Sequence, residues 1–289
     1  MSAPPLLRPP EWIRERKLRL GDLHRIRSLM RAHALRTVCE EARCPNRGEC
    51  FSRGTATFLL LGDVCTRACG FCDIATGRPR PVDPQEPDRV RAAVDRMALR
   101  HVVLTSVDRD DLPDGGAAHF ARTIRAVRSL EPAPAIEVLT PDFRGRFDSL
   151  RVVVDAKPEV FNHNVETVGR LYGRVRKGAR LDRSLGLLAA AKLLDPSVTT
   201  KSGLMLGLGE REEEVRELLE RMRESGVDIV TIGQYLRPSL QNLPVVEYVP
   251  PEAFDRHREF GEALGFRHVF AGPFVRSSYR AEEFAPPRA

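Results

Sequence analysis

Residues 57–72 read TFLLLGDVCTRACGFC, an apolar run that passes directly into a loop with three cysteines. The run at 57–62 is short, carries no charge and ends in glycine, which is typical of a buried β-strand. Cys65, Cys69 and Cys72 therefore follow the carboxyl end of that strand. Barrel enzymes built on parallel strands place their reactive groups on loops at this edge. The stretch predicts a functional thiol loop at the carboxyl edge of a parallel sheet.

All six cysteines of this 289-residue chain lie between residues 39 and 72, in two groups of three. Cys39, Cys44 and Cys50 have the spacing C-x4-C-x5-C, and the downstream group has the spacing C-x3-C-x2-C. The amino terminus lacks the apolar core of a secretory signal, so we expect a cytoplasmic protein. In that compartment, clustered cysteines indicate metal ligands rather than disulfides.

Three thiolates in a tight loop suit an iron–sulfur cube, which they would bind through three of its four irons. The iron left open indicates catalysis, by the same logic that separates catalytic from structural zinc sites. Structural zinc is the main alternative, but it usually takes four ligands in paired C-x2-C or C-x2-C…H-x3-H spacing. Neither group of cysteines has that pairing. A non-catalytic metal-binding scaffold and unrelated structural cysteines are further alternatives.

The composition fits a globular enzyme. Hydrophobic residues make up 42% of the chain and charged residues 30%, and no apolar run reaches the roughly 18 residues of a membrane helix. The formal net charge is +6, but the positive charge comes almost entirely from arginine. A single-strand nucleic-acid site would interleave basic and aromatic side chains, and this chain offers only Trp12 and four tyrosines for stacking. We therefore expect no membrane and no nucleic acid as partners.

The pattern of the remaining chain alternates strands with helices, which predicts an α/β fold with a parallel sheet and right-handed crossovers. Six such units predict a partial (β/α)6 barrel, because full eight-fold closure would need more repeats. The expected strands are 57–62, 100–105, 135–139, 159–162, 199–206 and 228–232, and the expected helices are 87–99, 116–129, 165–175, 183–194, 210–224 and 251–264.

Phe71 directly precedes the last cysteine of the downstream group, and this arrangement resembles the signature of the radical S-adenosylmethionine superfamily. Further passages, spread over about residues 12–279, are similar to one family within it, the lipoyl synthases. The passages are VCEEA at 38–42, RP at 78–79, TSVDRDDL at 105–112, FNHN at 161–164, KSGLM at 201–205 and RSSY at 276–279.

The resemblance implies the partial barrel of that superfamily with an extension at each end. We expect residues 1–56 to form an N-terminal extension that carries the cysteines of an auxiliary cluster. Residues 57–265 would form the barrel, and residues 266–289 would form a C-terminal segment that supplies a cluster ligand. In this arrangement Cys65, Cys69 and Cys72 bind the radical-generating four-iron cluster, and Cys39, Cys44 and Cys50 bind the auxiliary four-iron cluster.

The resemblance also implies the activity, that of a sulfurtransferase of lipoate biosynthesis. S-adenosylmethionine is cleaved to a 5′-deoxyadenosyl radical, which abstracts hydrogen at C6 and then at C8 of an octanoyl chain held in amide linkage by a lysine of a carrier protein. The auxiliary cluster donates both sulfur atoms and is consumed. Unactivated C–H bonds are beyond protein side chains, so the cofactors carry this step.

The implied partners are octanoylated carrier domains of 2-oxoacid dehydrogenase subunits and of the glycine cleavage system. A reductant such as flavodoxin or ferredoxin and an iron–sulfur carrier are implied as well. The nearest alternative is another radical enzyme, which uses its auxiliary cluster for electron transfer or for a different sulfur insertion.

Polar and aromatic residues near the strand ends are candidates for binding S-adenosylmethionine. Hydroxyl and carboxylate groups after the second strand suit the methionyl amine, and a buried carboxylate on the third strand needs a partner such as a ribose or an amine. Each polar candidate also has an ordinary interpretation as a turn residue or a helix cap. The candidates are Phe71, Thr105, Ser106, Asp108, Glu137, Asn162 and Asn164.

The auxiliary group of three cysteines lacks a fourth ligand, and the chain has no seventh cysteine. Ser277 and Ser278 offer hydroxyls beside Arg276, whose charge favours an alkoxide, and a cluster iron lowers a ligand's pKa as metals do for water. The resemblance points to this segment, and we favour Ser278 over Ser277 as the ligand. The alternative is a flexible polar tail.

Overall fold

The structure of this chain is a computed structural model that describes residues 7–14, 35–37, 55–279 and 281–283. Within these ranges, the central feature is an eight-stranded sheet with the order β1-β2-β5-β6-β7-β8-β9-β10. The strands from β2 to β10 run parallel, and β1 pairs with β2 in the antiparallel direction. Their bounds are β1 Arg36–Thr37, β2 Thr55–Leu60, β5 His101–Ser106, β6 Ala135–Leu139, β7 Val160–Asn162, β8 Thr199–Leu206, β9 Ile229–Gln234 and β10 His268–Gly272.

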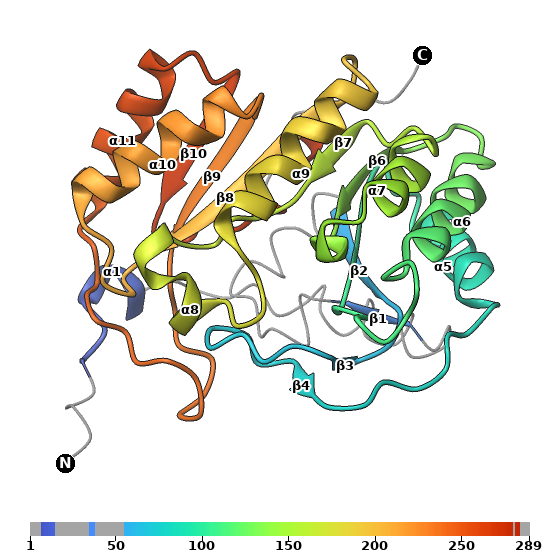
Figure 1. The fold of residues 1–289 in the computed structure, drawn as a ribbon, viewed down its shortest axis with the longest axis horizontal. Coiled ribbons are helices and arrows are strands. Elements are labelled where there is room, and N and C mark those ends of the chain that lie inside the picture. The colour runs from blue at the N-terminus through green and yellow to red at the C-terminus, as the bar shows by residue number, and fades with distance from the viewer. Residues whose placement is uncertain (1–6, 15–34, 38–54, 280, 284–289) are drawn as a thin grey trace.

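Helices cover the outer side of this curved sheet (Figure 1). The longer ones are α5 Glu86–Arg96, α6 Ala117–Arg128, α7 Phe147–Val154, α9 Leu181–Leu194, α10 Glu212–Glu224 and α11 Pro251–Ala263. The shorter ones are α1 Glu11–Arg14, η1 Phe143–Gly145, η2 Gly169–Leu171, α8 Tyr172–Val175 and η3 Ala281–Glu283. A second sheet of two parallel strands, β3 Val64–Cys65 and β4 Ala75–Thr76, lies with α8 at the lower edge in Figure 1.

The central strands are buried on both faces, as parallel strands covered by helices must be, which explains their nearly continuous apolar runs. The helices bury one stripe each. In α10, Val215, Leu218, Leu219 and Met222 recur at helical spacing and face the core. Acidic residues in its first turn and arginines in its last turn complement the helix dipole.

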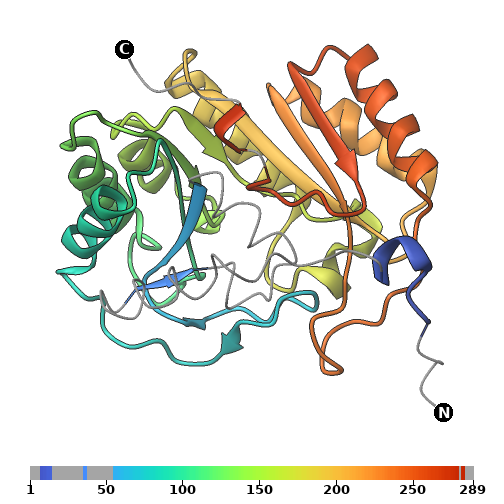
Figure 2. The ribbon, with the colours of Figure 1, turned by 180° about the vertical axis from the view of Figure 1, so that it is seen from behind.

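The barrel is open among the described strands, because β1 and β10 stand at the two ends of the strand order. The view from behind shows the segment after β10 crossing this open side (Figure 2). The crossing brings η3 into contact with β5. The C-terminal segment therefore runs from the carboxyl end of β10 across the open side of the barrel to β5.

The expected α/β fold and all six expected strands are confirmed, with boundary shifts of a few residues. The structure adds a seventh parallel strand, β10, so residues 266–289 begin with a strand of the barrel itself. The expected helix at 165–175 is wrong in its first half. Glu166 forms a parallel bridge with Leu204 at a positive φ of 68°, so helical structure begins only at Gly169.

Within the described ranges, every helix is too short or too polar to cross a lipid bilayer.

Candidate active site

A cavity of about 510 Å³ opens at the carboxyl edge of the sheet. Its walls come from strand ends, from the cysteine loop after β2, from the loop after β9 and from the segment after β10. The cavity therefore gathers segments from both ends of the described chain, at the edge where the sequence predicted a functional loop.

Cys65, Cys69 and Cys72 are free thiols that all line this cavity. Burial raises the pKa of Cys69 to about 12 and the pKa of Cys72 to about 11. Burial and the nearby Asp108 carboxylate raise the pKa of Cys65. Thiols with such raised pKa values become ligands only when a strong positive charge nearby favours loss of the proton. A bound metal supplies that charge, so a coordinating thiol is deprotonated. The donor set fits an iron-containing group.

Among the described residues, no group of three or more His, Cys, Asp or Glu side chains is arranged around one metal ion. A structural zinc site would need such convergence of its ligands. The thiolates of a four-iron cluster bind different irons and do not converge on one point.

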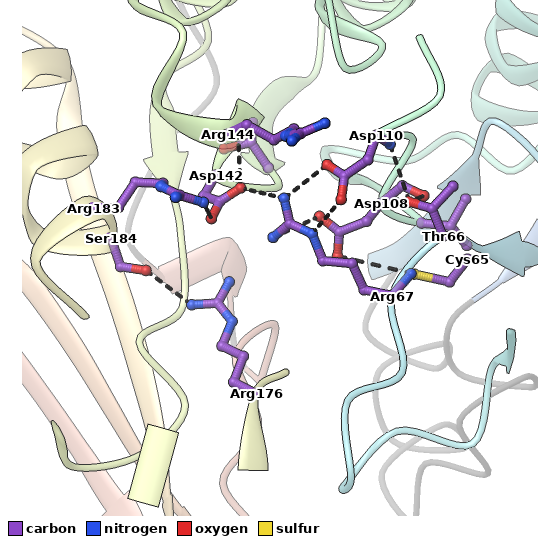
Figure 3. A network of polar contacts seen from close by, with 12 residues as sticks. Cys65, Thr66, Arg67, Asp108, Asp110, Asp142, Arg144, Arg176, Arg183 and Ser184 are labelled. Carbon is purple, nitrogen blue, oxygen red and sulfur yellow. Dashed lines mark hydrogen bonds and ion pairs between the residues drawn. The ribbon is translucent and has the colours of Figure 1, made fainter. Parts of the chain in front are cut away.

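Arg67 ties the cysteine loop to the ends of β5 and β6 (Figure 3). Its guanidinium lies 3.3 Å from Asp108, donates to Asp110 at 2.7 Å and donates to Asp142 at 2.7 Å. The side chain of Asp142 is fully buried. Burial alone would raise the pKa of Asp142, but the hydrogen bond and charge of Arg67 hold it well below its ordinary value. A hydrogen-bonded ion cluster thus fixes the loop that carries the thiols.

The other side of the loop is held by backbone contacts that require glycine. Gly70 donates to the Val175 carbonyl at 2.9 Å and accepts from the Leu243 N–H at 2.9 Å. A Cβ atom on Gly70 would lie 2.7 Å from Leu243 Cδ1 and 3.2 Å from the Arg174 carbonyl oxygen. The loop is therefore clamped between the end of α8 and the loop that follows β9.

Five of the predicted cofactor-binding residues line the cavity: Phe71, Thr105, Ser106, Asp108 and Asn164. The hydroxyls of Thr105 and Ser106 donate to backbone carbonyls at 2.8 and 2.9 Å, so their oxygens remain available as acceptors. Burial is the main influence on Asp108, and it raises the pKa of that carboxyl.

The other two, Glu137 and Asn162, are fully buried and are not among the residues that line the cavity. Glu137 pairs with Lys201, whose Nζ lies 3.0 Å from both carboxylate oxygens. Asn162 donates to Glu137 at 2.8 Å and to Ser277 at 2.8 Å. Protein partners thus satisfy Glu137, and the structure leaves it no access to a bound molecule.

Ser277 and Ser278 line the same cavity as the three thiols. The Ser277 hydroxyl accepts from Asn162 at 2.8 Å and donates to Asn164 at 3.0 Å. The Ser278 hydroxyl accepts from Thr57 at 3.1 Å. The two neighbouring serines therefore differ: both hydrogen-bonding directions of Ser277 are occupied, while the hydrogen bond described for Ser278 leaves its proton and a lone pair to spare.

Glu166 and Arg176 are charged cavity residues that the sequence analysis did not single out. Glu166 lines the cavity at its positive φ, and burial raises its pKa. Arg176 lines the cavity and donates to the Asn164 carbonyl at 2.7 Å and to Ser184 at 3.0 Å. The rule that selected polar residues at strand ends would have found Glu166 if it had been extended two residues past Asn164. No comparable signal marks Arg176.

A family model described as the Radical SAM superfamily matches residues 59–222 of this chain. A lipoyl synthase of Caldanaerobacter subterraneus is 55% identical over 276 residues, which cover 96% of this chain and 96% of the relative. The lipoyl synthase of Rubrobacter xylanophilus is 56% identical over 274 residues, covering 95% of this chain and 85% of the relative. This chain belongs to the lipoyl synthase family.

Solved structures of more distant proteins share the fold of this lipoyl synthase family member. Streptococcus suis SuiB bound to the precursor peptide SuiA has a TM-score of 0.60 at 13% identity, covering 88% of this chain and 53% of that one. Methylornithine synthase has a TM-score of 0.51 at 15% identity, covering 95% of this chain and 90% of that one. At such identities the likeness concerns the fold alone, and it agrees with the partial barrel described above.

Membership in the lipoyl synthase family confirms the predicted class of enzyme, a radical S-adenosylmethionine sulfurtransferase. Its cofactors are S-adenosylmethionine and four-iron clusters, of which two are typical of lipoyl synthases. Cys39, Cys44 and Cys50 lie outside the described residues, so their role at a second cluster stays a prediction.

Proposed function

We propose that this lipoyl synthase family member inserts two sulfur atoms, at C6 and C8, into an octanoyl chain held in amide linkage by a lysine of a carrier protein. Cys65, Cys69 and Cys72 bind the cluster next to S-adenosylmethionine. Cys39, Cys44 and Cys50, together with Ser278, bind the auxiliary cluster. When bound, these cofactors supply the electron, the hydrogen-abstracting radical and the sulfur.

One observation carries the assignment: the three thiols and the serines of the RSSY segment line one cavity. Sulfur insertion requires the activated carbon and the sulfur source to meet within one enclosed site, because a carbon radical reacts with any nearby hydrogen donor. A cavity shared by the thiol loop and by the segment predicted to ligate the auxiliary cluster supports this requirement.

The hydrogen bonds of the two serines support Ser278 as the auxiliary ligand. A hydroxyl becomes a metal ligand by losing its proton and offering a lone pair. Ser277 has committed its proton to Asn164 and accepts from Asn162, whereas Ser278 is described with one accepted hydrogen bond. Ligation by Ser278 costs one hydrogen bond from Thr57, while ligation by Ser277 would break its hydrogen bonds with both Asn162 and Asn164.

The cavity also contains groups that suit S-adenosylmethionine. Asp108, Asn164 and Glu166 offer oxygen acceptors, and these match the amine and ribose hydroxyl donors of the cofactor. Phe71 adds an aromatic surface beside the thiols. We assign these four residues to cofactor binding and assign Glu137 and Asn162 to a supporting position.

The carrier partners are octanoylated domains of 2-oxoacid dehydrogenase subunits and of the glycine cleavage system. Electrons come from a small reductant such as flavodoxin or ferredoxin, and an iron–sulfur carrier rebuilds the auxiliary cluster. An anaerobic assay that follows product formation while one carrier or reductant is replaced by another tests these partners.

Two cysteine variants test the division of labour between the clusters. Cys69→Ala should lose formation of 5′-deoxyadenosine while the auxiliary cluster still assembles. Cys44→Ala should retain cleavage of S-adenosylmethionine but give no thiolated product. Normal cleavage by the first variant, or normal lipoyl yield from the second, would show that the groups are assigned wrongly.

A further inference from the structure

The barrel interior contains a buried charged layer on three neighbouring strands. Glu137 lies on β6, Asn162 on β7 and Lys201 on β8, and all three side chains are fully buried. Burial alone would raise the pKa of Glu137, but the charge of Lys201, the neighbouring His101 and a hydrogen bond from Asn162 keep it below its ordinary value. The carboxylate is therefore ionised inside the protein, next to the ammonium of Lys201.

A buried ion pair of this kind is weak evidence for stability, because its desolvation cost often exceeds the attraction between the charges. An apolar pair of similar volume would serve the core as well. The role of the Glu137–Lys201 pair is therefore sought in the hydrogen bonds that the Glu137 carboxylate accepts from its neighbours, not in the stability of the core.

An ionised carboxylate can only accept hydrogen bonds, so it fixes the orientation of the Asn162 amide. The reverse orientation would place the Asn162 oxygen against the Glu137 carboxylate, with no proton between them. The Nδ2 group instead gives one hydrogen to Glu137 at 2.8 Å and the other to Ser277 at 2.8 Å. Asn162 Oδ1 has no hydrogen-bond partner in the part of the chain that the structure describes, so the donor side determines the orientation.

The direction of the next hydrogen bond follows from this one. Ser277 accepts from Asn162, so its own proton points elsewhere, and it is donated to Asn164 Oδ1 at 3.0 Å. The hydroxyl of Ser277 is thereby fixed to two side chains of β7 and of the turn that follows it. The next residue along the chain is Ser278, which lines the cavity beside the thiol loop.

We propose that Glu137, held ionised by Lys201, acts through Asn162 as a positioning residue that seats Ser277 and thereby presents Ser278 to the auxiliary cluster. This inference rests on the proposed role of Ser278 as a ligand. This positioning role explains why the Glu137–Lys201 pair lies buried in the barrel core and not in the lining of the cavity.

The decisive comparison uses two neutral replacements of the ion pair in the full-length chain. E137Q/K201M keeps an oxygen acceptor for Asn162, whereas E137M/K201M fills a similar volume without one. Both replace Glu137 and Lys201 together, so neither leaves one of these two ions without the other, and the buried His101, whose Nε2 lies 3.7 Å from Glu137, is the same in both variants. Glu214→Gln serves as a control, because Glu214 lies in the first turn of the outer helix α10 and pairs with Arg170.

The first readout is hydrogen exchange of the backbone amides of residues 275–279 in the iron-free protein. Losing the acceptor for Asn162 should speed exchange in this segment about tenfold or more in E137M/K201M, as expected when a buried hydrogen bond is lost. E137Q/K201M should exchange at an intermediate rate, because its amide can accept from Asn162 Nδ2 or donate to Asn162 Oδ1, and Glu214→Gln should exchange as the unmodified chain does. Equal exchange in the two double variants would show that Glu137 does not position Ser277 through Asn162, whether or not Ser278 is a ligand.

The second readout uses reconstituted protein and counts thiolated product per 5′-deoxyadenosine, together with the Mössbauer signal of the auxiliary cluster labelled with ⁵⁷Fe. E137M/K201M should lower the product ratio about tenfold or more, as changes in outer-shell partners of metal ligands do, and should alter the signal of one iron. E137Q/K201M should lie between E137M/K201M and the unmodified chain in both. An unchanged ratio and signal in E137M/K201M would contradict the presentation of Ser278.

A variant pair in the C-terminal segment keeps the test independent of substitutions on the barrel strands. Ser277→Ala removes the seated hydroxyl and should reproduce the E137M/K201M effects, while Ser277→Thr retains the hydroxyl and should exchange normally. Ser278→Ala could transfer sulfur normally while Ser277→Ala still shows faster hydrogen exchange in residues 275–279. That result would refute Ser278 as a ligand but would support the positioning of Ser277 by Asn162.

Discussion

Arg67 and Asp142 form a hydrogen-bonded ion pair at 2.7 Å between the cysteine loop and the end of β6, and the side chain of Asp142 is fully buried. The pair connects the thiol loop to the barrel at a place that no solvent reaches. Its consequences for stability and cluster assembly are directly measurable.

Arg67→Met should destabilise the protein by about 3–5 kcal/mol, because it leaves a buried carboxylate without its main partner. The thiol loop should lose its position, so iron binding at Cys65, Cys69 and Cys72 should fall as well. Urea unfolding of the iron-free protein and iron analysis after reconstitution measure these effects. Arg151→Met, at an exposed pair with Asp148, should change stability by no more than about 1 kcal/mol. Equal effects of the two variants would show that the Arg67–Asp142 pair does not hold the thiol loop in place.

The same pair predicts how stability depends on pH. The pKa of Asp142 is lower in the folded chain than its ordinary value near 3.9, so the folded state binds its proton less readily than the unfolded state. Its contribution to stability is complete above about pH 4 and is lost as the pH falls towards the folded pKa. Asp142→Asn should flatten this part of the curve of unfolding free energy against pH. An unchanged slope below about pH 4 would assign the acid sensitivity to other carboxylates.

Gly70→Ala should displace the thiol loop, because the new Cβ atom would lie 2.7 Å from Leu243 Cδ1 and 2.8 Å from Leu243 Cγ. Iron bound per chain after reconstitution should drop. Gly70→Ala combined with Leu243→Ala should recover most of the loss, since the clash is mainly with that side chain. If the double variant binds no more iron than the single one, the contact with Leu243 is not what excludes a side chain here.

Glu166→Gln should weaken binding of S-adenosylmethionine about tenfold or more, because a hydrogen bond to a charged group is worth about 1.5–3 kcal/mol. Equilibrium binding to the reconstituted enzyme measures this effect. Glu214→Gln removes a carboxylate of an exposed pair with Arg170 on the outer surface and should leave the affinity unchanged. The same affinity in all three proteins would remove Glu166 from the cofactor site.

Local pattern was sufficient to predict the thiol loop and the six expected strands. A buried parallel strand reads as a continuous apolar run, and a loop after it at the carboxyl edge is a property of the topology. The strand β10 was missed because only one of its five residues, Val269, is buried, so its sequence lacks that signal. The false start of the helix at 165–175 has a tertiary cause, the bridge between Glu166 and Leu204.

Partner choice among polar residues could not be predicted in the same way. Glu137 lies within β6 and Asp108 follows β5, yet Lys201 satisfies Glu137 whereas Asp108 lines the cavity. Their difference depends on residues far apart in the chain, and no local spacing encodes it. The same is true of Arg67, whose three carboxylate partners come from two different strand ends.

The central claim is that one cavity carries out both radical formation and sulfur insertion. Its most direct test incubates the anaerobically reconstituted chain with S-adenosylmethionine, a reductant and an octanoyl-lysyl peptide, and analyses the peptide by mass spectrometry. The account predicts a peptide that has gained two sulfur atoms, at C6 and C8, with 5′-deoxyadenosine formed alongside. Formation of 5′-deoxyadenosine with no sulfur in the peptide, from protein that holds both clusters, would contradict it.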